Sequence, residues 1–410
     1  MHCPMPRAGR LLALTPQSDG TGDTRGTCGT RALWQLRTTH GAQTSRRSHP
    51  PRLTPPPAST MIPCGVGKQS CVVAGKEQSV VRCALISGKG MGIMHGKNFH
   101  GLPDSKVVAV CDMDPKLLET AKAEFQVPGF ASIEELLAGA EFDLALLITN
   151  ETRRIPPLRQ LLAAGKHVFT EKPLCGMEGQ YRVREHDACI AAAAIKEWKV
   201  SKLQFGINYN YRFFRHFQRL HNEAVEGKFG TLRLVRARAH FNCWSHVIDQ
   251  ILWTMGRPEW VSVSGNPSEP GGWTRFIRMQ WANGAIGELD GSNLWGYDDH
   301  PLRIQICGDT AYGEARGLDG WYRRCKGSSW PTAVEETWEV EPGVQEYKES
   351  FGRMAAAVIE AIKSGAQWPA DGDAAWNELL FEAAVHRSAL HDGARVRVAD
   401  VEKACMAENC

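Results

Sequence analysis

A lysine that follows a buried strand is the residue of this chain with the clearest potential for chemistry. Residues 168–174 join an apolar, β-branched run, typical of a strand end, to the turn Glu171-Lys172-Pro173. In an open α/β sheet, ligands bind in the crevice at the carboxyl ends of the strands. We therefore expect Glu171 and Lys172 to face a ligand, although an isolated Glu-Lys-Pro tripeptide is more often a solvated surface turn.

A glycine-rich turn is the second candidate site. It follows the apolar run 80–86, precedes a helix-compatible segment, and consists of Ser87, Gly88, Lys89, Gly90, Met91 and Gly92. Backbone N–H groups at such a strand-to-helix turn can bind a pyrophosphate.

An acidic residue stands where a dinucleotide site needs one. Asp112 ends the apolar run 107–111, twenty residues after Gly92. A carboxylate there can bind both ribose hydroxyls of the adenosine half and repels a 2′-phosphate. The combination predicts a site for NAD, with NADP the less favoured cofactor. The alternative that Asp112 only starts the turn before Pro115 stays open.

Composition narrows the class of partner. Lys and Arg outnumber Asp and Glu by ten to three in residues 1–80 but are outnumbered by 42 to 38 in residues 81–410. The main body is therefore slightly acidic, which argues against nucleic acid as a partner. The chain has no apolar run of membrane-spanning length, and its 13 cysteines show neither paired nor zinc-ligand spacing. We expect a cytoplasmic protein with reduced thiols, no membrane contact and no metal site.

Residues 1–79 differ from the rest of the chain. They are rich in Arg, Ser, Thr, Gly and Pro and show no sustained apolar periodicity. Such a composition predicts a disordered basic extension. Two origins stay open for it, an organelle transit peptide and a gene-model extension upstream of the true start.

The hydrophobic periodicity predicts an α/β protein with two domains. Strand-like and helix-like runs alternate over residues 80–208, which indicates a doubly wound parallel sheet. Residues 209–402 read as an α+β domain with an open, mostly antiparallel sheet. Its expected strands are 232–241, 260–264, 274–281, 285–289 and 302–306. We expect the C-terminal helices, 347–364 and 373–390, to pack back on the body.

The motifs together resemble the glucose-fructose oxidoreductase / inositol dehydrogenase (Gfo/Idh/MocA) family from about residue 81 to about residue 398. The matching motifs are Gly90-Met91-Gly92 with His95, Asp112, Thr149, residues 164–168, Glu171-Lys172-Pro173, residues 210–213 and residues 246–249. The resemblance implies a Rossmann domain, a second domain with an open sheet, and an active site between them. It also implies a homo-oligomer that forms through the open sheet.

The resemblance assigns roles to particular residues. The implied cofactor-binding residues are Ser87, Gly88, Lys89, Gly90, Met91, Gly92, Asp112, Thr149, Asn150, Glu171, Lys172 and Arg212. The implied catalytic residues are Lys172, His246 and Asn242, and the implied substrate-binding residues are Tyr211, Asn242, His246 and Asp249. We expect His246 to accept the substrate proton and Lys172 to stabilise the developing alkoxide.

Departures from the family pattern keep two functions open. Ser87 and Lys89 stand where the first two glycines are usual, and Asn242 replaces the family's aspartate. Asp249 could supply the missing carboxylate, or it could pair with Arg236 or Arg238. The first hypothesis is an NAD-dependent oxidoreductase acting on the secondary alcohol or carbonyl of a sugar, polyol or similar small molecule. The alternative is an NAD-binding sensor with weak or no turnover.

Overall fold

The computed structural model describes residues 80–266, 274–292, 302–327, 333–368 and 370–407. The prediction of a disordered extension over residues 1–79 lies outside these ranges. Within them, no helix is long and apolar enough to cross a membrane.

The first domain contains a six-stranded parallel sheet. Its strands are β1 (Val81–Ile86), β2 (Ser105–Cys111), β3 (Gly129–Phe130), β4 (Leu144–Leu147), β5 (His167–Thr170) and β6 (Phe205–Ile207). They lie in the order β3-β2-β1-β4-β5-β6. This order reverses direction between β1 and β4, so the carboxyl ends of these two strands border a crevice. Because the central strands are buried on both faces, they read as continuous apolar runs in the sequence.

Helices connect these strands and begin at local signals. They are α1 (Gly90–His100), α2 (Pro115–Phe125), α3 (Ile133–Gly139), the 3-10 turn η1 (Glu151–Arg153), α4 (Ile155–Ala163) and α5 (Glu185–Val200). Asp114 caps α2 by accepting from the backbone N–H of Lys116 at 2.8 Å. A capping box at the start of α3 is half formed. Ser132 accepts from Glu135 N, whereas the Glu135 carboxylate accepts from Ala131 N.

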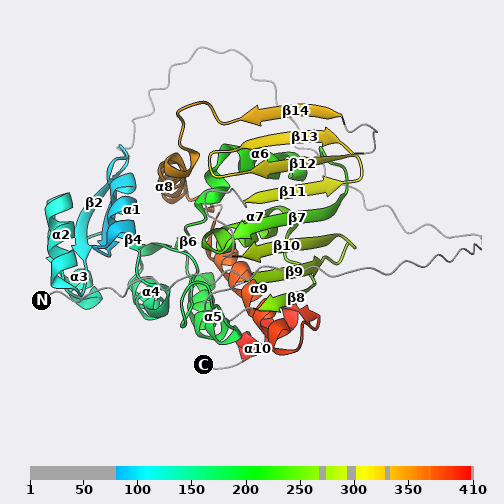
Figure 1. The fold of residues 1–410 in the computed structure, drawn as a ribbon. Coiled ribbons are helices and arrows are strands. Elements are labelled where there is room, and N and C mark those ends of the chain that lie inside the picture. Colours follow the sequence, from blue (N-terminus) through cyan, green and yellow to red (C-terminus); the bar gives the residue numbers. More distant parts are fainter. Residues whose placement is uncertain (1–79, 267–273, 293–301, 328–332, 369, 408–410) are drawn as a thin grey trace, which may run out of the picture. The chain divides into compact units, whose positions relative to one another are not determined.

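The second domain contains a nine-stranded sheet (Figure 1). Its strands are β7 (Leu232–His240), β8 (Trp260–Asn266), β9 (Thr274–Gln280), β10 (Ile286–Ser292), β11 (Arg303–Gly308), β12 (Ala311–Arg316), β13 (Trp321–Lys326), β14 (Val334–Glu339) and β15 (Val396–Arg397). Within the described strands of this second sheet, all neighbouring pairs are antiparallel except β7 and β10, which run parallel. The predicted fold class is therefore confirmed, although strands β12 to β15 were not predicted.

Helices cover one face of this sheet. The remaining helical elements are η2 (Asn210–Phe213), α6 (Arg215–Val225), η3 (Phe241–Cys243), α7 (Trp244–Met255), α8 (Glu346–Ser364), α9 (Gly372–Leu390) and α10 (Val398–Ala407). Helix α6 packs on β12 and β13, α7 on β7, and α9 on β8 (Figure 1). The other face carries cross-strand ion pairs, Arg236 with Glu288 and Arg238 with Asp290. The expected homo-oligomer through this open face stays a prediction, which the molecular mass in solution would test.

The C-terminal helices connect the two sheets. Helix α8 packs against α1, and α9 packs against both α5 and β6. At this junction the buried Trp368 covers Gly206 of β6 and stacks on Phe169 of β5. A Cβ at position 206 would overlap the Trp368 ring, so only glycine fits there.

A methyl group at Gly206 should destabilise the protein because the indole and its neighbours are close-packed. We expect Gly206→Ala to lower the free energy of unfolding by about 1–3 kcal/mol, measured by urea unfolding. The matched control is Gly352→Ala in helix α8, where a Cβ would meet only Asn98 Oδ1 at 3.5 Å. That variant should be neutral or more stable, because alanine favours helix. Equal losses in the two variants would contradict this account.

Candidate active site

One cavity of ≈ 1150 Å³ brings together most of the residues predicted from the sequence. It opens at the carboxyl ends of β1, β2, β4 and β5, and η2, η3, α7 and α8 also contribute to its lining. The predicted residues that line it are Ser87, Lys89, Gly90, Met91, Gly92, Asp112, Thr149, Asn150, Glu171, Lys172, Tyr211, Asn242 and His246. Three predicted residues, Gly88, Arg212 and Asp249, are not part of this lining.

The glycine-rich turn forms one end of the cavity. Lys89 is the N-cap of α1, and Gly90 is the first residue of the helix. A Cβ at Gly90 would meet nothing within 4 Å, so the helix N-terminus borders open space. Gly92 has a different role, because a Cβ there would overlap the Ser87 carbonyl oxygen. The turn therefore presents helix N–H groups and the Lys89 side chain to the cavity, which suits an anionic phosphate.

Asp112 both shapes the turn and faces the cavity. Its carboxylate accepts from Gly88 N at 2.7 Å and from Asp114 N at 2.9 Å. A carboxylate has about four acceptor positions, so two backbone bonds leave capacity for ligand hydroxyls. Gly88, although it does not line the cavity, holds this carboxylate in place. The two readings of Asp112 left open by the sequence, turn former and ribose ligand, are thus compatible.

Glu171 is held in a buried hydrogen-bond network at the base of the cavity. His95 Nε2 of α1 lies 2.7 Å from Oε1, and Asn208 Nδ2 donates to the same oxygen at 2.6 Å. The backbone N–H of Lys172 donates to Oε2 at 3.0 Å. Burial opposes ionisation of Glu171, but these hydrogen bonds and the nearby charges outweigh it and lower its pKa to about 2. The carboxylate is therefore ionised and orients the start of the lysine turn.

A series of hydrogen-bonded side chains begins at Lys172 and crosses the cavity. Lys172 Nζ donates to Gln180 Oε1 at 2.9 Å, and Gln180 Nε2 donates to Tyr181 Oη at 2.7 Å. Tyr181 Oη in turn donates to Asn242 Oδ1 at 2.7 Å. The series joins the turn after β5 to η3, which precedes α7. Gln180 and Tyr181 were missed at the sequence level because they lie in a loop without a recognisable pattern.

His246 faces the same space in a neutral form. Its ring stacks on Tyr211, with centroids 4.2 Å apart and planes inclined by 14°. Burial and the Lys172 charge lower its pKa to about 3, against a smaller opposite effect of Glu171. This value lies well below the ordinary imidazole pKa of 6.5. The neutral ring can accept a proton, although it is a weaker base than an exposed histidine.

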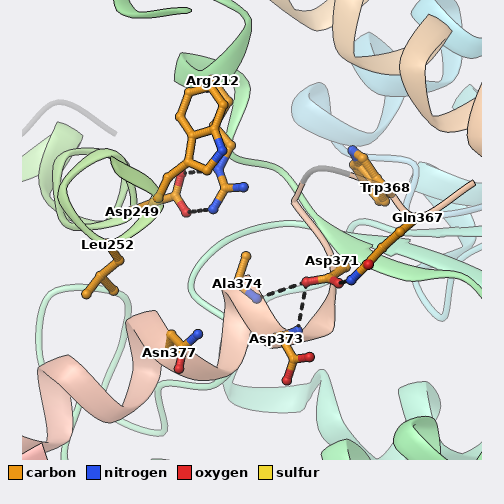
Figure 2. Close-up of a pocket in the computed structure, with 10 residues that line it drawn as sticks. Arg212, Asp249, Leu252, Gln367, Trp368, Asp371, Asp373, Ala374 and Asn377 are labelled. Carbon is orange, nitrogen blue, oxygen red and sulfur yellow. Dashed lines mark hydrogen bonds and ion pairs between the residues drawn. The ribbon is translucent and has the colours of Figure 1, made fainter. Parts of the chain in front are cut away.

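Arg212 and Asp249 lie in a different place. They form a buried ion pair in which Arg212 Nε donates to Asp249 Oδ2 at 2.8 Å. The pair lines a separate cavity of ≈ 430 Å³, together with residues of α9 such as Ala374 and Asn377 (Figure 2). The structure therefore brings neither residue to Lys172, and Asp249 does not replace a carboxylate at position 242. Its partner is Arg212 rather than Arg236 or Arg238.

The cavity lining fits a polar ligand of dinucleotide type. Within the described part of the chain, five residues of the lining carry a buried polar atom without a hydrogen-bond partner, namely Thr149 Oγ1, Arg154 Nε, Asn208 Oδ1, Asn210 Oδ1 and His246 Nδ1. Buried polar atoms normally have partners, so unpartnered ones gathered around one cavity indicate a site for a polar ligand. The described residues contain no group of three or more His, Cys, Asp or Glu side chains arranged for a metal ion.

The strand order of the parallel sheet, the glycine-rich turn and Asp112 together define a Rossmann-type dinucleotide-binding domain. This domain is joined to an α+β domain. Comparison with known proteins agrees. Residues 81–202 match the family model GFO_IDH_MocA, described as "Oxidoreductase family, NAD-binding Rossmann fold". This match confirms, for that part of the chain, the family predicted from the sequence, and its description confirms the expected cofactor class, NAD.

Individual relatives are distant. An inositol 2-dehydrogenase of Rhizobium meliloti is 25% identical over 155 residues, 38% of this chain and 44% of the relative's own length. The uncharacterized oxidoreductase YrbE of Bacillus subtilis is 23% identical over 325 residues, 70% of this chain and 88% of the relative. A solved levoglucosan dehydrogenase in complex with NADH and levoglucosan superposes with a TM-score of 0.67 at 16% identity, covering 78% of this chain and 100% of that chain. The structural likeness confirms the fold.

The buried network around Glu171 predicts a pH-dependent contribution to stability. Its folded-state pKa of about 2 lies below the ordinary value of 4.5, so ionised Glu171 stabilises the fold above pH 4.5. The stabilisation is lost as the pH falls from 4.5 towards 2. The difference in unfolding midpoint between wild type and Glu171→Gln should be constant near neutral pH and shrink below pH 4.5. Glu119→Gln, at an exposed site on α2, is the control. A difference that does not change between pH 7 and pH 4 would contradict the assignment.

Proposed function

We propose that this chain is an oxidoreductase that transfers a hydride between NAD(H) and a secondary alcohol or carbonyl of a small hydroxylated molecule, such as a sugar or polyol. The observation that carries the proposal is the common cavity of Asp112, the glycine turn, Lys172 and His246. A site for cofactor alone needs no ammonium group and neutral imidazole beside each other. The similarity to an inositol dehydrogenase and a levoglucosan dehydrogenase supports this substrate class.

The residues of the cavity divide into two groups under this proposal. Residues at the carboxyl ends of β1 and β2 bind the dinucleotide, with the pyrophosphate at the N-terminus of α1 and the ribose at Asp112. Bound NAD supplies the hydride acceptor, and NADH the donor. The Lys172 ammonium stabilises negative charge on the reacting oxygen. His246, neutral because of its burial, takes up or returns the hydroxyl proton.

The alternative, an NAD-binding sensor with little turnover, has specific support. Ser87 stands where the first glycine of the turn is usual, and its own backbone φ is 155°. Asn242 is uncharged at a position where a carboxylate is usual. The low pKa of His246 also reduces its strength as a base. Titration of purified protein with NADH, followed by a screen of sugars and polyols for NADH formation, separates the two functions. Binding without turnover favours the sensor, and absence of binding overturns both.

The described cysteines support the expected location. They include the thiols of Cys83, Cys111, Cys175, Cys307 and Cys325, and all of these except Cys307 are buried. Free thiols are usual where glutathione and thioredoxin keep the compartment reducing. We therefore propose a cytoplasmic location, which fractionation of cells that express the tagged full chain would test.

Replacing Asp112 should weaken NADH binding selectively. Loss of a charged partner for the ribose hydroxyls costs about 1.5–3 kcal/mol, or roughly 10- to 100-fold in affinity. We expect Asp112→Ser to lower NADH affinity by that factor. The variant should bind NADPH and NADH with similar affinities, measured by fluorescence titration. Glu119→Gln on α2 is the control for surface charge. Unchanged NADH affinity in a folded Asp112→Ser variant would contradict the cofactor assignment.

Removing the two candidate catalytic groups should lower turnover far more than cofactor binding. We expect Lys172→Met to lower kcat by about 10²–10³-fold through loss of charge stabilisation. His246→Ala should lower it by about 10²–10⁴-fold through loss of proton transfer. The measurements are NADH formation with the best compound of the screen and NADH fluorescence titration. Retained turnover in the folded double variant would remove both residues from the mechanism.

A further inference from the structure

A continuous hydrogen-bonded chain connects Lys172 to Asn242. It runs through Gln180 and Tyr181 with successive donor–acceptor distances of 2.9, 2.7 and 2.7 Å. Gln180 and Tyr181 belong to the loop between β5 and α5, whereas Asn242 belongs to η3 beside the second sheet. All four side chains line the large cavity. The chain therefore joins the two domains across the site.

The charge of Lys172 determines the direction of every bond in this chain. An ammonium group can only donate, so the Gln180 carboxamide must turn its oxygen to Lys172 and its NH₂ group to Tyr181. Tyr181 Oη then accepts from Gln180, and its own proton is left to donate to Asn242 Oδ1. Because the oxygen of Asn242 is engaged, its amide nitrogen lies on the other side of the carboxamide group.

The loop that carries Tyr181 is itself anchored. The Tyr181 ring packs edge-on against Phe241 at 4.5 Å, and its carbonyl oxygen accepts from the buried Arg275 at 3.4 Å. The buried Asp187 accepts from the backbone N–H groups of Met177 and Arg184. Burial also raises the pKa of Tyr181, against a smaller opposite effect of Gln180. The phenol is thus held in place as a proton donor.

We propose that Gln180 and Tyr181 are positioning residues that hold the Asn242 amide nitrogen toward the substrate. Asn242 then presents a donor to the cavity that Lys172 also lines, where an aspartate would present an acceptor. Donors without an acceptor match oxygens that only accept, as in a carbonyl or carboxylate group. This inference rests on the proposed function and specifies its substrate class as compounds that carry such an oxygen next to the reacting carbon.

The variant Gln180→Glu tests the direction of the chain without touching Lys172 or Asn242. A glutamate accepts from Lys172 with one oxygen and from Tyr181 with the other, because an ionised carboxylate has no proton to donate. Tyr181 must then accept from Asn242, whose oxygen turns to the cavity. Tyr181→Phe is the matched control, since it removes the link that transmits the change.

A spectroscopic readout tests the inference without any substrate. In full-length protein labelled with [¹⁵N]asparagine, the side-chain amide signal of Asn242 is assigned by its loss in Asn242→Asp. We expect one amide proton to move downfield in Gln180→Glu, where it donates to Tyr181, and no such shift in Gln180→Glu/Tyr181→Phe. The absence of a shift in Gln180→Glu, or an equal shift in the double variant, would overturn the inference. NADH titration of each variant checks that the part of the cavity formed by the glycine-rich turn and Asp112 still binds the cofactor.

A substrate readout uses the matched probes D-gluconate and D-sorbitol, which differ at one terminal carbon. In Gln180→Glu the side-chain oxygen of Asn242, an acceptor, faces the carboxylate of gluconate. The ratio of kcat/KM for gluconate to that for sorbitol should therefore fall. The expected loss is about tenfold, equivalent to one hydrogen bond of roughly 1.4 kcal/mol. An unchanged ratio would overturn the assigned substrate class. If neither the probes nor the screen give NADH, the proposed function fails, and the amide shift still decides whether Gln180 and Tyr181 position Asn242.

Discussion

The geometry of the site depends on one buried carboxylate, that of Glu171. It is bonded by His95 from α1, by Asn208 after β6 and by the backbone of Lys172. An ionised group in the interior is stable only when such donors replace water. His95 is in turn packed between Phe169 of β5 and Phe351 of α8. A single charge therefore fixes the glycine-turn helix, the lysine turn and a C-terminal helix relative to one another.

The fixed turn gives Lys172 a defined direction, and the second domain supplies what the lysine meets. Asn242 and His246 arrive from η3 and α7, which pack on β7 at the centre of the nine-stranded sheet. Rigid elements on both sides set the distance between the ammonium group and these residues. The loop after β5 closes the gap with Gln180 and Tyr181. The reactive end of the cavity is thus built by both domains.

The sequence predicted those parts whose signal is local. Continuous apolar runs revealed the strands that are buried on both faces, and Lys172, Asp112 and the glycine turn followed from their places at strand ends. Strands β12 to β14 were missed because their outer positions carry charges, such as Glu314 and Arg323, that pair across strands. The contacts of Tyr181 with Asn242, and of Arg212 with Asp249, join distant segments and leave no local pattern.

The uncharged Asn242 and the low pKa of His246 belong together physically. A carboxylate near an imidazole stabilises its protonated form and raises its pKa, whereas an amide does so much less. With Asn242 present, burial and the Lys172 charge lower the pKa of His246, and only Glu171 raises it. The ring is therefore neutral. Under the proposed function, negative charge that develops on a bound oxygen is then stabilised chiefly by Lys172, and neutral groups handle any proton. The replacement of one carboxylate thus shifts the electrostatic task of the site onto the lysine that Glu171 holds in place.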